Sequence, residues 1–135
     1  MFQDLSQRIR FSNKPVIAAP FQLTLGGGVE LVQPATHRVA AAETYMGLVE
    51  VGVGLIPGGG GNLRMILNAM DSDSGRMGAF QKIKDIFEIV GFAKIARSAD
   101  EAKHLGYLKK TDTIVMNRNH LLKISKNKAI EFSQN

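Results

Sequence analysis

Glycine is concentrated in one part of this 135-residue chain. Ten of its 14 glycines lie between Gly26 and Gly61, and two runs stand out, Gly26–Gly28 and Gly58–Gly61. Glycine has no Cβ, so it adopts left-handed backbone conformations and lets other atoms approach the main chain closely. Short, nearly uncharged apolar segments lie around these runs. The first half of the chain is therefore predicted to form short buried elements joined by tight turns.

The apolar segments and their flanking prolines predict two strands and two helices in this half. A helix should open after Gly26–Gly28 and end early, because Pro34 lacks an N–H and clashes with the preceding turn. The strands are predicted at 16–19 and 38–42, and the second helix over about 62–69.

The second half has a helical pattern. A helix over about 79–96 is predicted to bury the face formed by Phe80, Ile83, Phe87 and Val90. Ser98 begins a capping-box pattern whose short helix should stop near Gly106. The remaining expectations are a polar loop at 71–78, a strand at 113–116 and a final helix over about 119–132.

Alternating strand and helix signals indicate an α/β fold. Two or three strands are too few for a closed core, so we expect a partial domain, or a subunit that completes its sheet with a partner. Residues 1–70 should form the glycine-rich core segment of this domain, and residues 71–135 its helical C-terminal region.

The composition excludes several classes of protein. The absence of cysteine excludes disulfide scaffolds, Cys-ligated zinc and thiol nucleophiles. No apolar stretch is long enough to span a membrane, and the N-terminus lacks a signal peptide, so a cytoplasmic location is expected. The net charge is +5, but basic residues alternate with acidic and apolar ones, and both tyrosines lie outside basic clusters. A nucleic-acid partner is therefore not predicted.

The glycine runs do not match the known phosphate-binding motifs. No Gly-Lys pair follows Gly58–Gly61, as a P-loop requires. The dinucleotide-binding fingerprint Gly-x-Gly-x-x-Gly is also absent. Its last glycine is replaced by Leu31 when the pattern starts at Gly26, and by Pro57 when it starts at Gly52. A Gly-x-Ser-x-Gly nucleophile elbow is also absent. The three histidines are far apart and show no metal-binding spacing, so no metal is expected.

Two isolated carboxylates remain as candidates. Glu30 is the only charged residue between positions 14 and 37, and Glu50 the only one between 43 and 64. A carboxylate in apolar surroundings is costly unless it is hydrogen-bonded or has a raised pKa, so such groups are candidates for acid–base catalysis. Each could instead be an ordinary carboxylate at the start of a helix. Likewise, Gly26–Gly28 could present N–H groups to an oxyanion or simply form a structural turn.

Several blocks together resemble the crotonase, or enoyl-CoA hydratase/isomerase, superfamily. They occur in the order and spacing of that superfamily: Lys14–Ala19, Leu25–Leu31, Arg38–Glu43, Met46–Gly61 and, later, Ser98–Tyr107. The segments Glu43–Glu50 and Ile114–Asn119 are more similar still to one subgroup. Its members are fused enzymes with a 3-hydroxyacyl-CoA dehydrogenase first and an enoyl-CoA hydratase last.

The resemblance implies a partial crotonase fold and a hydratase of fatty-acid β-oxidation, with the balance between hydratase and isomerase left open. By position, Glu30 and Glu50 would be the two catalytic carboxylates that hold one water as it adds to a trans-2-enoyl-CoA. Gly27 would donate an N–H to the thioester oxygen, and Gly58 would help to place the water. The substrate is an acyl-CoA thioester, CoA is part of it, and no metal or other cofactor is implied.

The chain departs from the family in three ways. The upstream part of the family domain, with its early strands and second oxyanion N–H, does not precede Lys14 here. Val49 stands where the family usually has proline, and Pro34 falls in the helix that carries Glu30. We therefore expect the chain alone to be inactive or very weak. The alternative is a non-catalytic fragment that forms a homo-oligomer or pairs with an upstream half-domain through Phe80, Ile83 and Phe87.

Overall fold

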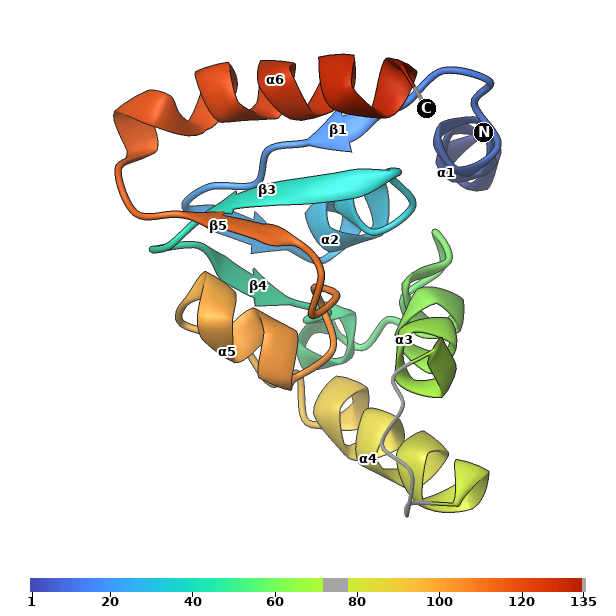
Figure 1. The fold of residues 1–135 in the computed structure, drawn as a ribbon. Coiled ribbons are helices and arrows are strands. Elements are labelled where there is room, and N and C mark those ends of the chain that lie inside the picture. Colours follow the sequence, from blue (N-terminus) through green and yellow to red (C-terminus); the bar gives the residue numbers. More distant parts are fainter. Residues whose placement is uncertain (72–77, 135) are drawn as a thin grey trace.

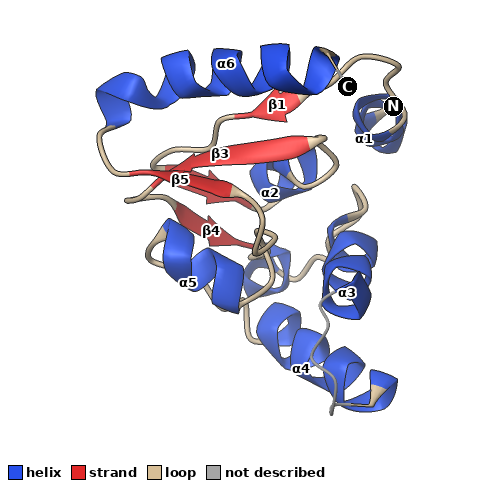
Figure 2. Cartoon of the chain, viewed as in Figure 1, coloured by secondary structure: helices blue, strands red, loops and turns tan. Residues whose placement is uncertain are grey.

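The structure is a computed structural model that describes residues 1–71 and 78–134. Short strands and helices alternate through most of the chain (Figures 1 and 2). The helices are α1 Phe2–Arg10, α2 Gly27–Val32, α3 Gly61–Asp71, α4 Ala79–Gly91, α5 Ala99–His104 and α6 Leu121–Ser133, with short 3₁₀ turns η1 Glu50–Val53 and η2 Arg118–His120. The strands are β1 Ile17–Ala18, β2 Leu23–Leu25, β3 His37–Ala41, β4 Tyr45–Gly47 and β5 Thr113–Val115.

The strands form two small parallel sheets. One has the order β1-β3-β5, with Ile17 opposite His37 and Val39 opposite Thr113. The other pairs β2 with β4, so that Leu25 lies opposite Gly47. Strand β2 leads directly into helix α2, and β4 leads into the 3₁₀ turn η1. The pairing of the two strands therefore places the start of α2 beside the start of η1. Within the described residues, no helix is long and apolar enough to cross a membrane.

The core has two parts. α6 lies across β1 and β3, and its Leu121 packs with Val39, Ala41 and Val115 (Figure 1). The larger cluster joins α2, β4, α3, α4 and α5, and residues from both halves of the chain build it: Val29, Ala40, Met46, Leu48, Met65, Ile86, Val90, Ala96, Ala99, Ala102, Tyr107 and Leu108. The segments 1–70 and 71–135 therefore share a core.

Most predicted elements are present. α2 ends at Val32 with Gln33 as its C-cap, so Pro34 lies outside the helix and costs no helical hydrogen bond. Ser98 caps α5 by accepting the N–H of Glu101 at 3.1 Å. Gly106 has φ +85°, as expected for a residue that ends a helix. The predicted loop at 71–78 lies outside the described residues, apart from positions 71 and 78.

The prediction for the helix at 79–96 is wrong in two respects. α4 ends at Gly91, and a turn follows in which Ala93 has φ +48°. The buried side chains of α4 are Ile86 and Val90. Of the other residues predicted on the buried face, Phe80, Ile83 and Phe87 are 81%, 45% and 75% exposed. Helical periodicity identifies an apolar stripe but not what covers it, and in this chain nothing among the described residues covers the two phenylalanines.

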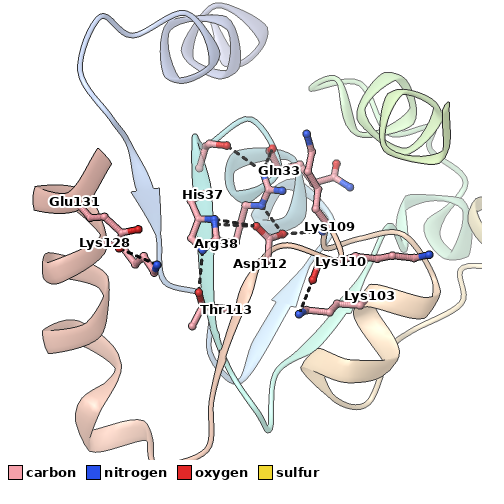
Figure 3. A network of polar contacts seen from close by, with 11 residues as sticks. Gln33, His37, Arg38, Lys103, Lys109, Lys110, Asp112, Thr113, Lys128 and Glu131 are labelled. Carbon is pink, nitrogen blue, oxygen red and sulfur yellow. Dashed lines mark hydrogen bonds and ion pairs between the residues drawn. The ribbon is translucent and has the colours of Figure 1, made fainter. Parts of the chain in front are cut away.

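A buried ion pair joins β3 to the turn before β5 (Figure 3). The Arg38 Nε donates to Asp112 Oδ2 at 2.8 Å, and both side chains are almost completely buried. The backbone N–H groups of Arg38 and Lys109 also donate to Asp112, at 3.1 and 2.7 Å. On the same side, His37 Nε2 lies 2.9 Å from Thr113 Oγ1. This network fixes the register between two strands that are far apart in the sequence.

Candidate active site

Glu30 lies on α2, one turn after the Gly26–Gly28 run. Its side chain is buried, with 4% of the residue exposed. The Oε1 atom accepts two hydrogen bonds from backbone N–H groups, Gly59 at 2.8 Å and Gly61 at 3.0 Å. The turn before α3 therefore holds this carboxylate in one orientation.

This turn depends on its glycines. A Cβ at Gly59 would stand 2.6 Å from Glu30 Oε2 and would also clash with the ring of Phe2. A Cβ at Gly61 would stand 2.8 Å from Leu48 Cδ2. Bare main chain is thus required where the second glycine run meets Glu30.

Glu50 begins η1, directly after β4. Its Oε2 atom is buried and has no hydrogen-bond partner among the described residues. Burial raises the pKa of the Glu50 carboxyl, and the nearby charge of Glu30 raises it further, while the backbone N–H groups of Glu50 and Val49 act in the opposite direction. The Glu50 carboxyl group therefore ionises less readily than an ordinary glutamate.

The first glycine run packs against Glu50. Gly26 has φ +54°, a conformation that favours glycine, and its N–H donates to Gly47 O at 2.7 Å. A Cβ at Gly26 would stand 3.3 Å from Glu50 Oε1. Gly26 thus connects the turn that opens α2 to the strand that leads to Glu50.

The charge of Glu30 contributes to the raised pKa of Glu50, so the two predicted carboxylates lie within electrostatic reach of each other. Gly27 is the first residue of α2, so its N–H has no acceptor within the helix. Gly58 lies in the turn that contacts Glu30, and its carbonyl accepts from Gln3 Nε2 at 2.7 Å. The roles predicted for Gly27 and Gly58 stay predictions.

Sequence reasoning missed four residues that contribute to this site. It singled out Gly58, whereas Gly59 and Gly61 donate the hydrogen bonds to Glu30. It gave no role to Phe2, whose ring packs against Gly27 and Gly59. It also passed over Tyr107, whose buried hydroxyl lies near Glu50. None of these contacts has a local sequence signal, because each joins residues that are distant in the chain.

The part of the chain that the structure describes contains no group of three or more His, Asp or Glu side chains able to hold a metal ion. Two carboxyl groups, bare backbone N–H groups and an apolar surround are what this site offers to a reactant. Such an arrangement can move protons and can stabilise a developing oxyanion.

Comparison with known proteins agrees with the fold. Residues 3–84 match the model of the enoyl-CoA hydratase/isomerase family. The chain therefore belongs to this family, and its fold is a partial crotonase fold. An enoyl-CoA hydratase from Bacillus anthracis superimposes with a TM-score of 0.76 at 28% identity, over 99% of this chain and 45% of that one.

Two curated relatives add detail. A "Probable 3-hydroxyacyl-CoA dehydrogenase" of Bacillus subtilis is 50% identical over 121 residues, which is 90% of this chain and 15% of the relative. A "Crotonyl-CoA hydratase" of Syntrophomonas wolfei is 43% identical over 63 residues, or 47% of this chain and 24% of the relative. The chain thus spans a quarter or less of these curated relatives and somewhat under half of the solved hydratase.

Proposed function

We propose that this chain supplies the acid–base half of an enoyl-CoA hydratase of fatty-acid β-oxidation, as part of a 3-hydroxyacyl-CoA dehydrogenase/hydratase protein. The observation that carries the proposal is a pair of carboxyl groups within electrostatic reach of each other: Glu30 is held by two backbone amides, and Glu50 has a buried oxygen with no partner among the described residues. The resemblance of 90% of the chain to a dehydrogenase-named relative supports the fused context. The substrate is a trans-2-enoyl-CoA, in which CoA is part of the substrate, and no metal or other cofactor takes part.

The environments of the two carboxylates assign different roles to them. Glu30 accepts hydrogen bonds on Oε1, which leaves Oε2 to take a proton from a water molecule. The water oxygen then bonds to the β-carbon of the enoyl group. Glu50, with its raised pKa, gives its proton to the α-carbon, and the C=C bond becomes a single bond. Both additions occur from the side where the two carboxyl groups lie, so the addition is syn.

The backbone N–H of Gly27 would bind the thioester oxygen while negative charge develops on it. A preorganised N–H donor of this kind commonly contributes ~100–1,000-fold in rate. The family uses two such donors, and the second belongs to the upstream part of the domain. For this reason we propose that the site reaches full activity only in an assembly that contains that part.

A second candidate function is that of a non-catalytic, complementing subunit. The observation in its favour is the uncovered apolar surface of α4, where Phe80 and Phe87 are 81% and 75% exposed. Exposed apolar surface of this kind is typical of protein interfaces. In this case the chain would form a homo-oligomer or pair with an upstream half-domain without hydrating any substrate.

One experiment separates the two candidates. Hydration of crotonyl-CoA is followed for this chain alone and for the chain mixed with a separately expressed upstream half of the hydratase domain. The assay is repeated with Glu30→Gln and Glu50→Gln, and with Glu43→Gln as a control, because Glu43 is exposed. We expect the mixture to be active, each site variant to lose ~100–10,000-fold in kcat, and the control to be unchanged.

The opposite result is equally clear. A stable mixed complex without hydration would support the complementing subunit and contradict the catalytic proposal. Full activity in both glutamine variants would show that other groups transfer the protons.

A further inference from the structure

Tyr107 occupies an unusual position for a tyrosine, because its whole side chain is buried and its hydroxyl has two backbone partners. The residue has no exposed surface. It follows Gly106, whose φ of +85° turns the chain inward after α5. The hydroxyl donates to the Lys94 carbonyl at 2.6 Å and accepts the N–H of Leu48 in a longer contact of 3.4 Å.

The two partners of this hydroxyl belong to segments that are already joined. Met46 and Ala96 exchange backbone hydrogen bonds of 3.0 and 2.7 Å, so β4 lies directly against the loop after α4. Between them, a Cβ at Gly47 would stand 3.0 Å from Lys94 O. The hydroxyl of Tyr107 adds a further link between the two segments, because it bonds both to the Lys94 carbonyl and to the N–H of Leu48, the residue after Gly47.

The loop that presents the Lys94 carbonyl is held in an uncommon conformation. Ala93 has φ +48°, a region that residues with a Cβ seldom adopt. Such a conformation persists when the surrounding contacts impose it. The strong hydrogen bond from Tyr107 to the next residue, Lys94, is one of those contacts.

We infer that Tyr107 is a positioning residue for Glu50, and that its hydroxyl fixes the turn from β4 into η1 on which Glu50 stands. The inference rests on the proposed role of Glu50 as proton donor. Leu48 is completely buried and lies two residues before Glu50. Without the hydroxyl, the Leu48 N–H and the Lys94 carbonyl would both lose a buried partner, which favours a movement of the turn toward water.

The hydroxyl itself does not ionise near neutral pH. Burial raises the pKa of Tyr107 to about 12, so the group stays neutral while it donates to Lys94. Tyr107 therefore acts through the geometry of Glu50 rather than as an acid or base. The geometric role can be tested by titrating Glu50. If the Tyr107 hydroxyl positions Glu50, its removal changes the surroundings of that carboxyl group and therefore its pKa.

The test is Tyr107→Phe, which removes the hydroxyl and keeps the ring, with Tyr45→Phe as the matched control, since Tyr45 is 42% exposed. The Glu50 carboxyl is titrated by carbon-13 NMR and assigned with Glu50→Gln. In Tyr107→Phe the pKa of Glu50 should fall toward its ordinary value as water reaches it. In the active assembly kcat should fall by roughly 10- to 100-fold with KM nearly unchanged, and Tyr45→Phe should alter neither quantity.

An unchanged Glu50 titration in a folded Tyr107→Phe variant would overturn the inference. If that variant does not fold, Gly47→Ala gives a second test, because its Cβ would push β4 away from Lys94 while Tyr107 stays intact. It should lower the Glu50 pKa in the same way, and an unaltered titration would again overturn the inference. A wild-type assembly without hydration would contradict the proposed function, whereas the NMR titration would still decide the positioning role.

Discussion

Asp112 and Glu50 are both carboxylates at the edge of a parallel strand pair, yet their surroundings differ sharply. Asp112 accepts three N–H groups, at 2.7, 2.8 and 3.1 Å, and one of them belongs to the buried Arg38 guanidinium. Glu50 has a buried oxygen without a hydrogen-bond partner among the described residues, and the charge that further raises its pKa comes from another carboxylate, Glu30. The Asp112 carboxylate is thus paired with a buried cation, whereas one oxygen of the Glu50 carboxyl has no partner among the described residues.

The difference separates a structural carboxylate from one suited to chemistry. A carboxylate that accepts three hydrogen bonds and pairs with a buried guanidinium holds strands in register and is poorly suited to passing a proton. A carboxyl group with a raised pKa and a free oxygen is less favourable for stability and better suited to proton transfer. The predictions below test whether this separation holds.

The largest effect on stability is expected at Asp112. Asp112→Ala leaves the buried Arg38 charge without its partner, which should lower the free energy of unfolding by about 3–5 kcal/mol. Urea unfolding measures the change, with Glu43→Ala as the control because Glu43 is exposed. A loss below about 1 kcal/mol, as is usual for surface ion pairs, would mean that the Arg38–Asp112 pair is not the structural element described here.

A smaller and oppositely directed effect is expected at Glu50. The pKa of this carboxyl is raised in the folded state, so the contribution of Glu50 to stability is fully present below its ordinary value of 4.5 and is lost as pH rises through the folded-state value. Glu50→Gln removes that loss. The stability gain of the variant should therefore increase with pH across this range in urea titrations. A gain that is independent of pH would show that Glu50 ionises as easily in the folded chain as in the unfolded one.

The smallest effect is expected at His37, beside Asp112. Burial lowers the pKa of His37; Asp112 and Glu131 raise it, and Arg38 and Lys128 lower it, so these charges largely oppose one another. Because the folded-state pKa lies below the ordinary 6.5, the contribution of His37 to stability is present above that pH and is lost as pH falls through the folded-state value. His37→Gln should remove this acid-side loss, as measured by thermal unfolding at a series of pH values. An unaltered acid-side slope would place His37 outside the network.

Sequence reasoning predicted much of the fold and part of the site. Gly26–Gly28, Pro34 and Ser98 act through their immediate neighbours, so the ends of α2 and the start of α5 followed from the sequence. The isolation of Glu30 and Glu50 among apolar residues also identified them as unusual. The buried face of α4 was predicted wrongly at Phe80 and Phe87, because periodicity carries no information about which neighbour covers a stripe.

The sequence by itself determined where the chain turns, which segments are apolar and which two carboxylates stand alone, since these are properties of local steric preference and composition. Only the tertiary structure decided that Gly59 and Gly61 hold Glu30, that Asp112 pairs with Arg38, and that Tyr107 reaches Leu48 in the turn before Glu50. The physical reason is that hydrogen bonding and desolvation depend on distance in space. Residues that are 29 to 74 positions apart in the chain lie in contact only in the folded structure.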